Sequence, residues 1–412
     1  MTEKEFFKVT SLSTVLELVK TFQCVSEETL PLDACIGRIL FTDIVSRIDL
    51  PGFNRATMDG YAVQARATFG ASENTPALFS IVGAVEMGEV PAVSVQLGEA
   101  VRIATGGMLP DGADSVVMVE HTQTLDEHTL EVFKSVTPLQ HVMEIGEDFR
   151  RDKRILTRGT RIRPQEIGVL AALGQAHVSV YRQPAVAIIS SGDEIVSIEQ
   201  NPGLSQMRDV NAYTLSGLIK LSGGIPIYLG IARDDFAALY DLCERALDRA
   251  DTVLISGGSS VGSRDFTLDV IRALPEAEVL VHGVSISPGK PTILARSKQK
   301  PIWGLPGQVT SAMVVFHVMV RPMLERIGGL LEDRLNTTSE VSALLSRNLA
   351  SVQGREDFVR VRLVRRGNQT YAEPILGKSG LIHTMVKADG FVRIDVNSEG
   401  LEKGAPVSVI LF

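Results

Sequence analysis

The chain has 412 residues, of which 44% are hydrophobic and 22% are charged, and its formal net charge is -8. This composition is typical of a globular protein with about two to four domains, and the acidic balance disfavours a general role on nucleic acid or on a membrane surface. The three cysteines lack a C-x-x-C pair and the seven histidines lack metal-ligand spacing, which argues against a disulfide framework and a zinc site.

The first 45 residues are predicted to be helical. The stretch SLSTVLELVKTF repeats apolar residues every three or four positions, and SEETLPLDACIGRIL contains a second short helix start. This amphipathic beginning does not have the pattern of a signal peptide, and no apolar run in the chain reaches the ~18 residues of a membrane span. We therefore expect a cytoplasmic protein without a membrane partner.

Residues 46–140 change character and predict a small all-β domain. Short β-rich runs alternate there with Gly, Pro and Asp turns; they are ALFSIVGAV, AVSVQLGEAVRIA, ADSVVMVEHTQTL and HTLEVFKSV. The following stretch RPQEIGVLAALG predicts a helix that stops at a glycine, and HVSVY after it predicts a strand.

From about residue 184 strands, loops and helices alternate. AVAIIS, IPIYLGIA and DTVLIS are predicted strands, SGDEIV a turn, and NAYTLSGLIKLSGG and DDFAALYDLCERALDRA helices. This order predicts a layered α/β domain with a largely parallel sheet. A final helix, GQVTSAMVVFHVMVRPMLERIG, is expected to break near Arg321-Pro322. Residues 341–412 return to short strands and predict another small β domain.

Four turns fall at the carboxyl ends of the predicted strands, where open α/β sheets bind ligands. They are SSGDE (190–194), GIARDD (230–235), SGGSSVGSRD (256–265) and GLPGQVTS (304–311). Their glycines let a ligand approach the backbone, whose N–H groups can cradle an anion. The sequence therefore predicts a phosphate-ester site at this edge of the sheet.

Three of these turns also contribute carboxylates: Glu194, Asp234 or Asp235, and Asp265. Carboxylates repel a phosphate unless a divalent cation bridges the two, so the pattern favours a cation beside the ester. Taken singly, each feature also fits a plainer role, because a glycine turn can serve tight packing and Asp234 can belong to the first turn of a helix.

A second polar group lies in the β-rich region. The stretch FNRATMDGYAV (53–63) places Asn54, Arg55, Asp59 and Gly60 in one turn, and TGGMLPDGAD adds a Gly-rich turn with the hydroxyl of Thr105. Composition alone favours two ordinary β-turns.

The motifs MDGYA, ATGGMLPDGADSVV, SSGDE, VNAYTL, ISGGSSVGSRDF, PGKP and GLPG occur in this order over about residues 10–410. In this the chain resembles the molybdopterin molybdenumtransferases, the family of MoeA and the gephyrin E domain. The resemblance implies an α/β multidomain subunit that forms a homodimer. Its parts are a helical, elongated linking domain (1–50 and 141–182), an inserted β-rich domain (51–140), a three-layer α/β molybdopterin-binding domain (183–328) and a C-terminal β-barrel-like domain (338–412).

The resemblance also implies a reaction, a step of molybdenum cofactor biosynthesis. Molybdate enters adenylylated molybdopterin and AMP leaves, with Mg²⁺ held by Asp234 and Asp265, and molybdopterin adenylyltransferase is an implied partner. The implied catalytic residues are Asp59, Thr105, Glu194, Asp234 and Asp265, the first two facing the α/β domain of the other subunit. The implied substrate-binding residues are Ser256, Gly257, Gly258, Ser260, Gly262, Lys290, Pro306, Gly307, Ser311 and Arg355, of which Lys290 and Arg355 attract molybdate.

The chain departs from the family pattern in places. Ser287 stands where the family has Lys, Gln308 and Val309 replace Asn and Pro, Met143 replaces an Arg, and Val210 replaces a small residue. These changes leave one alternative open: a degenerate or tungstate-preferring paralogue that binds molybdopterin as a scaffold. A phosphoester hydrolase of the competence-damage-like group is a second alternative, against which the MDGYA insertion argues.

Overall fold

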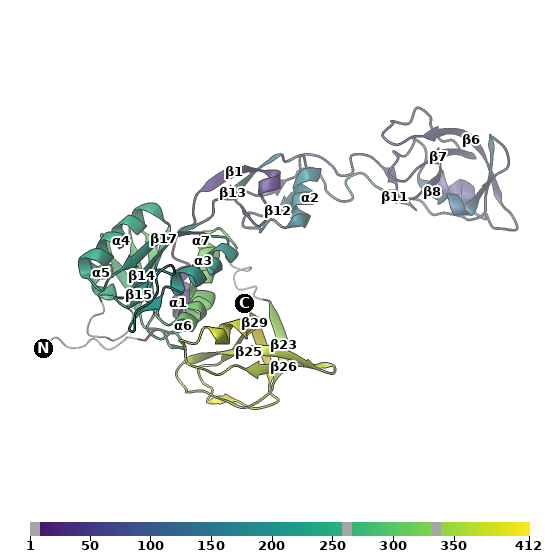
Figure 1. Cartoon of the computed structure of the whole chain (residues 1–412). Coiled ribbons are helices and arrows are strands. Elements are labelled where there is room, and N and C mark those ends of the chain that lie inside the picture. The colour runs from purple at the N-terminus through teal and green to yellow at the C-terminus, as the bar shows by residue number, and fades with distance from the viewer. Residues whose placement is uncertain (1–8, 258–265, 332–338) are drawn as a thin grey trace. The chain divides into compact units, whose positions relative to one another are not determined.

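The computed structural model describes residues 9–257, 266–331 and 339–412, and the chain divides into two compact units (Figure 1). The larger unit comprises Met1–Thr42, Arg158–Ile167 and Ala176–Phe412, and the smaller one comprises Asp43–Thr157 and Gly168–Gln175. Within the described residues, no helix has both the length and the apolar character needed to cross a membrane.

A six-stranded sheet of order β17-β14-β18-β22-β21-β19 forms the centre of the larger unit. Strands β14 (Ala185–Ser191), β17 (Ile225–Ala232), β18 (Thr252–Ser256) and β22 (Lys300–Leu305) run parallel, whereas β21 (Ile293–Ser297) and β19 (Glu278–His282) form an antiparallel edge. The prediction of a largely parallel sheet is thus confirmed.

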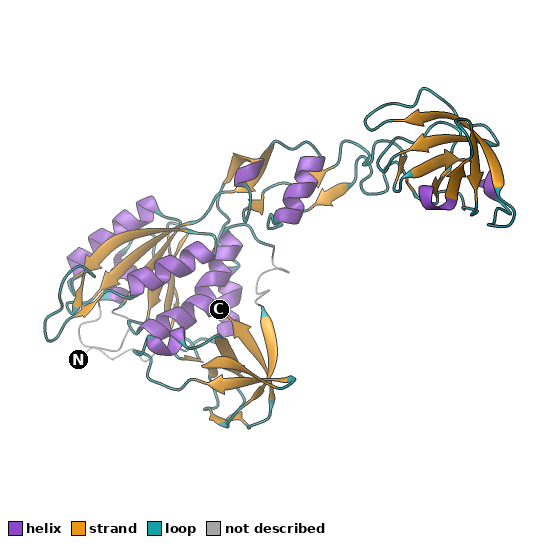
Figure 2. Cartoon of the chain, turned by 45° about the vertical axis from the view of Figure 1, so that its right-hand side comes forward, coloured by secondary structure: helices purple, strands orange, loops and turns teal. Residues whose placement is uncertain are grey.

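Helices cover both faces of this sheet, which is why β18 is buried along its whole length (Figure 2). Alternate strand residues such as Ile188 and Ile189 point to opposite faces and belong to two separate hydrophobic cores. One core contains α1 (Leu12–Val19), α3 (Asn211–Leu221), α6 (Val309–Val315) and α7 (Arg321–Ile327), and the other contains α4 (Phe236–Arg249) and α5 (Thr267–Ala273). We call this sheet with its helices the α/β domain.

The helix expected to break near Arg321-Pro322 instead contains a π-helical stretch, Phe316–Val320, between α6 and α7. Pro322 has no N–H to donate and its ring crowds the carbonyl one turn earlier, so the turn before it widens. Because Pro322 stands in the first turn of α7, that helix loses no hydrogen bond of its own.

Beyond α1, the second short helix start is present as a 3-10 turn, Leu32–Ala34, but the expectation of helix throughout the first 45 residues is wrong elsewhere. β1 (Glu27–Pro31) and β2 (Ile39–Leu40) both pair with the predicted strand β13 (His177–Tyr181). β1 has alternating burial, typical of a strand with one solvated face, and Gly37 has a φ of 76° that interrupts any helix. The helix predicted before β13 is present as α2 (Pro164–Ala172).

The smaller unit is β-rich, as predicted. Its main sheet has the order β8-β5-β7-β6-β10-β9 and two hydrophobic clusters, one around Ile103 and one around Phe79. The strands are β5 (Gly60–Val63), β6 (Ala77–Val85), β7 (Glu99–Ile103), β8 (Ser115–Met118), β9 (Thr122–Thr124) and β10 (Thr129–Val132). Two short pairs accompany it: β4 (Arg55–Ala56) with β11 (Val142–Met143), and β3 (Ile44–Val45) with β12 (Arg154–Leu156).

The C-terminal strands close into a barrel, because β25 pairs with both β26 and β27. Its strands are β23 (Glu340–Leu345), β25 (Glu356–Arg366), β26 (Gln369–Pro374), β27 (Gly390–Ile394) and β29 (Pro406–Leu411). The short strand β20 (Ile286–Ser287) of the α/β domain pairs with β25 and so fixes the barrel against it. The remaining elements are α8 (His383–Val386), β24 (Leu349–Ala350), β28 (Gly400–Leu401), β15 (Ile195–Val196) and β16 (Met207–Arg208).

Candidate functional site

A cavity of about 600 Å³, which we call the glycine cavity, opens at the carboxyl ends of β14 and β18 in the α/β domain. It contains four of the predicted site residues, Glu194, Ser256, Gly257 and Gly307. Its other lining residues include Ser190, Ser191, Asp209, Val210, Asn211, Gln308 and Val309. Among the described residues, three of the four strand-end turns that the sequence singled out therefore line one cavity, and the turn at 230–235 contributes no residue to it.

Two glycines allow these turns to pack closely. Gly257 has a φ of +108°, and a Cβ at this position would lie 2.1 Å from the Ser191 carbonyl oxygen. The Gly257 N–H donates to the Leu305 carbonyl at 3.3 Å, and a Cβ on Gly307 would lie 3.5 Å from the Gly257 Cα. Only glycine fits at 257, because any side chain there would meet both backbone strain and the neighbouring strand. Pro306, next to Gly307, is buried within the same turn.

The carboxylates at the sheet edge have distinct roles. Asp235 caps α4, since its Oδ1 accepts the Ala238 N–H at 2.9 Å. Asp234 is half-buried, and among the described residues its Oδ1 accepts a long hydrogen bond of 3.4 Å from the Ser191 hydroxyl. Glu194 is exposed, and its Oε2 lies 2.7 Å from where a Cβ of Gly192 would be. The helix-start role thus belongs to Asp235, and Asp234 presents its carboxylate at the strand ends.

The donors here suit Mg²⁺, which binds hard oxygen ligands. Across residues 9–257, 266–331 and 339–412, no three Asp, Glu, His or Cys side chains gather as a ready-made metal cage. Mg²⁺ rarely uses such cages; it is usually bound by one or two carboxylates, waters and substrate phosphates. Asp234 beside the glycine turns fits that pattern. Asp265, Gly258, Ser260 and Gly262 lie outside the described residues.

A second cavity of about 500 Å³, the basic cavity, lies between the α/β domain and the barrel. Lys290, Ser311 and Arg355 line it together with Ser287. The pairing of β20 with β25 places Ser287 opposite Asp357, and the Arg355 Nε lies 3.1 Å from the Asp357 Oδ1. Two cationic side chains and several hydroxyls around one space are the chemistry that binds an oxyanion.

The two cavities are neighbours. The backbone N–H and the hydroxyl of Thr310 both donate to the Ser379 carbonyl, at 3.1 and 2.6 Å. Val309 and Gly380 line the glycine cavity, whereas Ser311 and Ser379 line the basic cavity. One residue at the start of α6 therefore separates them.

Asp59 and Thr105 come together in the smaller unit. The Thr105 N–H donates to the Asp59 Oδ1 at 2.6 Å, and hydrogen bonds from Thr105 lower the pKa of Asp59. Asp59 is exposed and so remains an ionised carboxylate at the protein surface at neutral pH.

Sequence reasoning missed the polar residues behind the glycine cavity. Asp209 accepts from the Tyr228 hydroxyl at 2.9 Å, and Asn211 donates to both glycine turns. The stretch Asp-Val-Asn at the start of a predicted helix was the available signal, because such residues bond to nearby backbone rather than face solvent.

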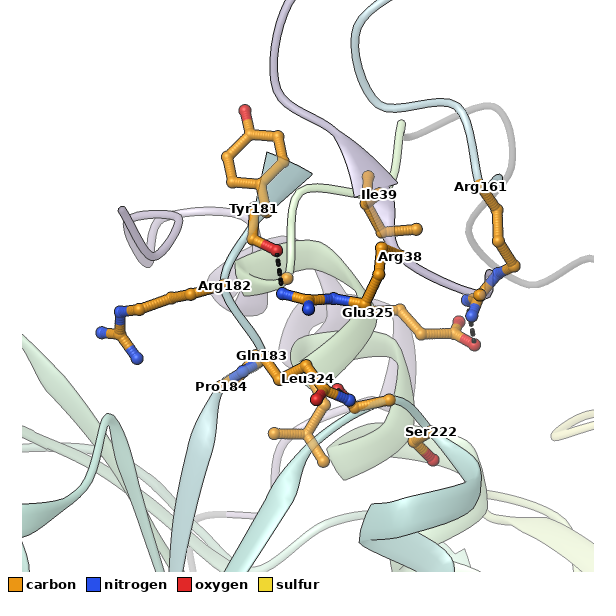
Figure 3. A pocket seen from close by; sticks show the side chains of 13 residues that line it. Arg38, Ile39, Arg161, Tyr181, Arg182, Gln183, Pro184, Ser222, Leu324 and Glu325 are labelled. Carbon is orange, nitrogen blue, oxygen red and sulfur yellow. Dashed lines mark hydrogen bonds and ion pairs between the residues drawn. The ribbon is translucent and has the colours of Figure 1, made fainter. Parts of the chain in front are cut away.

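A third cavity, drawn in Figure 3, has a volume of only about 30 Å³, room for about one water. Its arginines are engaged with carboxylates: Arg38 with Glu28, Arg161 with Glu325, and Arg182 with Asp251. Arg38 also donates to the Tyr181 carbonyl at 2.8 Å. We therefore assign this cavity a structural role.

Three parts of the chain match the models of known protein families. Residues 10–174 match the model of the MoeA N-terminal region (domain I and II), residues 187–326 a probable molybdopterin binding domain, and residues 342–412 the MoeA C-terminal region (domain IV). The chain is 37% identical over 387 residues to a molybdopterin biosynthesis protein of Methanocaldococcus jannaschii, covering 92% of this chain and 90% of that protein. The chain belongs to the MoeA family.

Further members of the MoeA family agree with this assignment. A molybdopterin molybdenumtransferase of Bacillus subtilis is 30% identical, with coverage of 93% of this chain and 90% of the relative. The crystal structure of a MoeA molybdopterin biosynthesis protein from Pyrococcus horikoshii superposes with a TM-score of 0.81 at 39% identity, covering 98% of this chain and 99% of that one. The resemblance stated from the motifs and the multidomain α/β fold are both confirmed.

Proposed function

We propose that this protein is a molybdopterin molybdenumtransferase that inserts molybdate into adenylylated molybdopterin and releases AMP, in the cytoplasm and with Mg²⁺. The observation that carries the proposal is the pair of neighbouring cavities, one with glycine turns and carboxylates and one with Lys290 and Arg355. A phosphate ester and a tetrahedral dianion need these two kinds of surface side by side. The MoeA family assignment supports the same substrates.

In this proposal the glycine cavity binds the adenylylated pterin. The strand-end turns at Gly257 and Gly307 let the phosphate group approach the backbone, because neither glycine carries a side chain. Asp234 and Asp265 would hold Mg²⁺, whose charge would stabilise the negative charge that develops on the leaving AMP. Glu194 lies at the rim and accepts hydrogen bonds from the substrate.

The basic cavity binds molybdate. Lys290 and Arg355 supply positive charge, and Ser287 and Ser311 supply hydroxyl donors. Asp357 already neutralises part of the Arg355 charge, so the attraction for a dianion is moderate. Since Val309 lines the glycine cavity and Ser311 lines the basic cavity, the oxyanion is held next to the bound pterin.

The active protein is a homodimer in this account, with Asp59 and Thr105 of one subunit completing the site of the other. The support is that two turns of the smaller unit bring these residues together through the Thr105–Asp59 hydrogen bond, in a part of the chain away in sequence from Glu194. Mixing Asp59→Asn and Glu194→Gln subunits should restore AMP release that neither variant has alone, because one site of each mixed dimer carries both intact groups. Absence of any restoration, with mixed dimers verified by mass spectrometry, would contradict a shared site.

The test of the function is direct. Purified protein receives adenylylated molybdopterin, Mg²⁺ and molybdate or tungstate, and AMP release and reconstitution of a cofactor-free molybdoenzyme are followed. The proposal expects both with molybdate. Pterin binding without AMP release would favour the scaffold alternative, and release with tungstate alone would favour the tungstate-preferring paralogue.

A molybdopterin adenylyltransferase is the partner class that must supply this substrate, and no nucleic acid takes part.

A further inference from the structure

Asn211, the first residue of α3, joins the two glycine turns of the glycine cavity. Its side chain is 8% exposed. The Nδ2 group donates one hydrogen bond to the Ser256 Oγ at 2.6 Å and another to the Gly307 carbonyl oxygen at 2.8 Å. Both amide protons are thus used, and each acceptor lies at the end of a different central strand, β18 or β22.

The start of α3 is itself fixed, so that the amide has a defined position. Asp209 is 3% exposed, and its Oδ1 accepts the Ala212 N–H at 3.0 Å, which orders the first turn of the helix. Its Oδ2 accepts from the Tyr228 hydroxyl at 2.9 Å. Burial, followed by the Asp209 charge, raises the pKa of Tyr228, so this hydroxyl stays protonated and continues to donate.

We propose that Asn211 is a positioning residue for recognition of the phosphate ester, because it sets the spacing between the Ser256–Gly257 turn and the Gly307 turn. This inference rests on the proposed function for the identity of the ligand. The two turns lie so close that a Cβ added to Gly307 would be 3.5 Å from the Gly257 Cα, so a small change of spacing alters the backbone surface that both turns present to the cavity. Because the Ser256 oxygen accepts from Asn211, its own proton is left for the ligand.

The residue type follows from this role. A neutral amide supplies two donors without adding charge to a cavity already lined by Glu194 and Asp209. An aspartate of the same size would place a carboxylate oxygen against the Gly307 carbonyl, and an alanine would leave that carbonyl and the buried Ser256 hydroxyl without this partner.

The first measurement needs no ligand and compares Asn211→Asp with Ser216→Ala. Ser216 is the matched control, because its hydroxyl donates to the Ala212 carbonyl at 2.6 Å on the same helix and touches neither turn. The Gly257 N–H should exchange with deuterium about tenfold faster in Asn211→Asp and at the wild-type rate in Ser216→Ala. Unchanged exchange in folded Asn211→Asp would overturn the inference.

The second measurement is the affinity for adenylylated molybdopterin without molybdate. Asn211→Asp should bind about tenfold more weakly with thermal stability checked in parallel, and Ser216→Ala should bind as the wild type does. Faster exchange with unchanged affinity would overturn the recognition role. If the wild type bound no pterin while exchange responded as expected, the proposed function would fail and the structural link through Asn211 would stand. Should Asn211→Asp not fold, Asn211→Ala gives the same readouts without a charge.

Discussion

The glycine cavity and the basic cavity are neighbours that are built on different principles. The glycine cavity is lined mainly by strand ends of the α/β domain, with Gly380 and Ile382 of the C-terminal region beside them, and its shape depends on the close approach of Gly257 and Gly307. The basic cavity lies between the α/β domain and the barrel, and its character depends on the charges of Lys290 and Arg355. The first should therefore be sensitive to shape and the second to charge, salt and the attachment of the barrel.

The largest effect is expected at the two carboxylates that are proposed to hold Mg²⁺. Asp234→Asn and Asp265→Asn should each keep the fold and lower Mg²⁺-dependent AMP release by at least about 100-fold, because each removes one charge from a cation site. Asp235→Asn is the matched control: it is next in the chain and caps α4, a role asparagine also fills. Equal AMP release from Asp234→Asn and Asp235→Asn would show that Asp234 binds no cation.

Shape sensitivity is tested by Gly257→Ala. The added Cβ would lie 2.1 Å from the Ser191 carbonyl oxygen at a φ of +108°, and we expect unfolding free energy to fall by about 3 kcal/mol and pterin binding to be lost. Gly230→Ala is the control, since its φ is +110° but nothing lies within 4 Å of the new Cβ. Denaturant unfolding of both variants measures the difference, and equal losses would mean that backbone strain alone matters at position 257.

The attachment of the barrel to the α/β domain is tested by the pH dependence of stability, because His317 lies between them. Its ring packs against Phe391 and Phe412, with centroids 5.8 and 5.3 Å apart, and burial followed by the Arg321 charge lowers its pKa to about 4. The unfolded chain binds this proton at higher pH, near 6.5, so stability is lost as pH falls from about 6.5 towards 4.

Replacement by glutamine should remove this pH dependence. Between pH 7 and pH 5 the unfolding free energy of the wild type should fall by about 2 kcal/mol more than that of His317→Gln. Oxyanion binding, which needs both the barrel and the α/β domain, should weaken on acidification before pterin binding does. If the unfolding free energies of the two proteins fell equally with pH, a group other than His317 would cause the loss of stability in acid.

The smallest effect is expected at Ser287, which lines the basic cavity together with Lys290 and Arg355. An added ammonium near a dianion contributes roughly 1 kcal/mol at high effective dielectric, so Ser287→Lys should lower the molybdate requirement by up to about tenfold. The gain should shrink as salt rises, because charges are screened over about 10 Å at 0.1 M. An identical molybdate dependence at low salt would mean that position 287 does not face the anion.

The sequence predicted those features of the fold and site that depend on residues close together in the chain. Gly257 and Gly307 are recognisable because strand-to-helix turns require glycine, and Asp59 and Thr105 belong to turns rich in polar residues. Asn211 and Asp209 were not singled out, since their partners Ser256, Gly307 and Tyr228 lie far along the chain. The strand β1 was missed for the same reason, because its pairing partner β13 follows about 150 residues later.

The central claim is that the pterin and the oxyanion occupy separate, neighbouring cavities of this chain. The most direct measurement is the position of tungsten, by anomalous diffraction, in crystals of the protein soaked with tungstate. The account predicts a peak in the basic cavity, within hydrogen-bonding reach of Lys290 or Arg355, and its loss in a Lys290→Ala, Arg355→Ala variant. A peak among the glycine turns, with none beside Lys290 and Arg355, would contradict it.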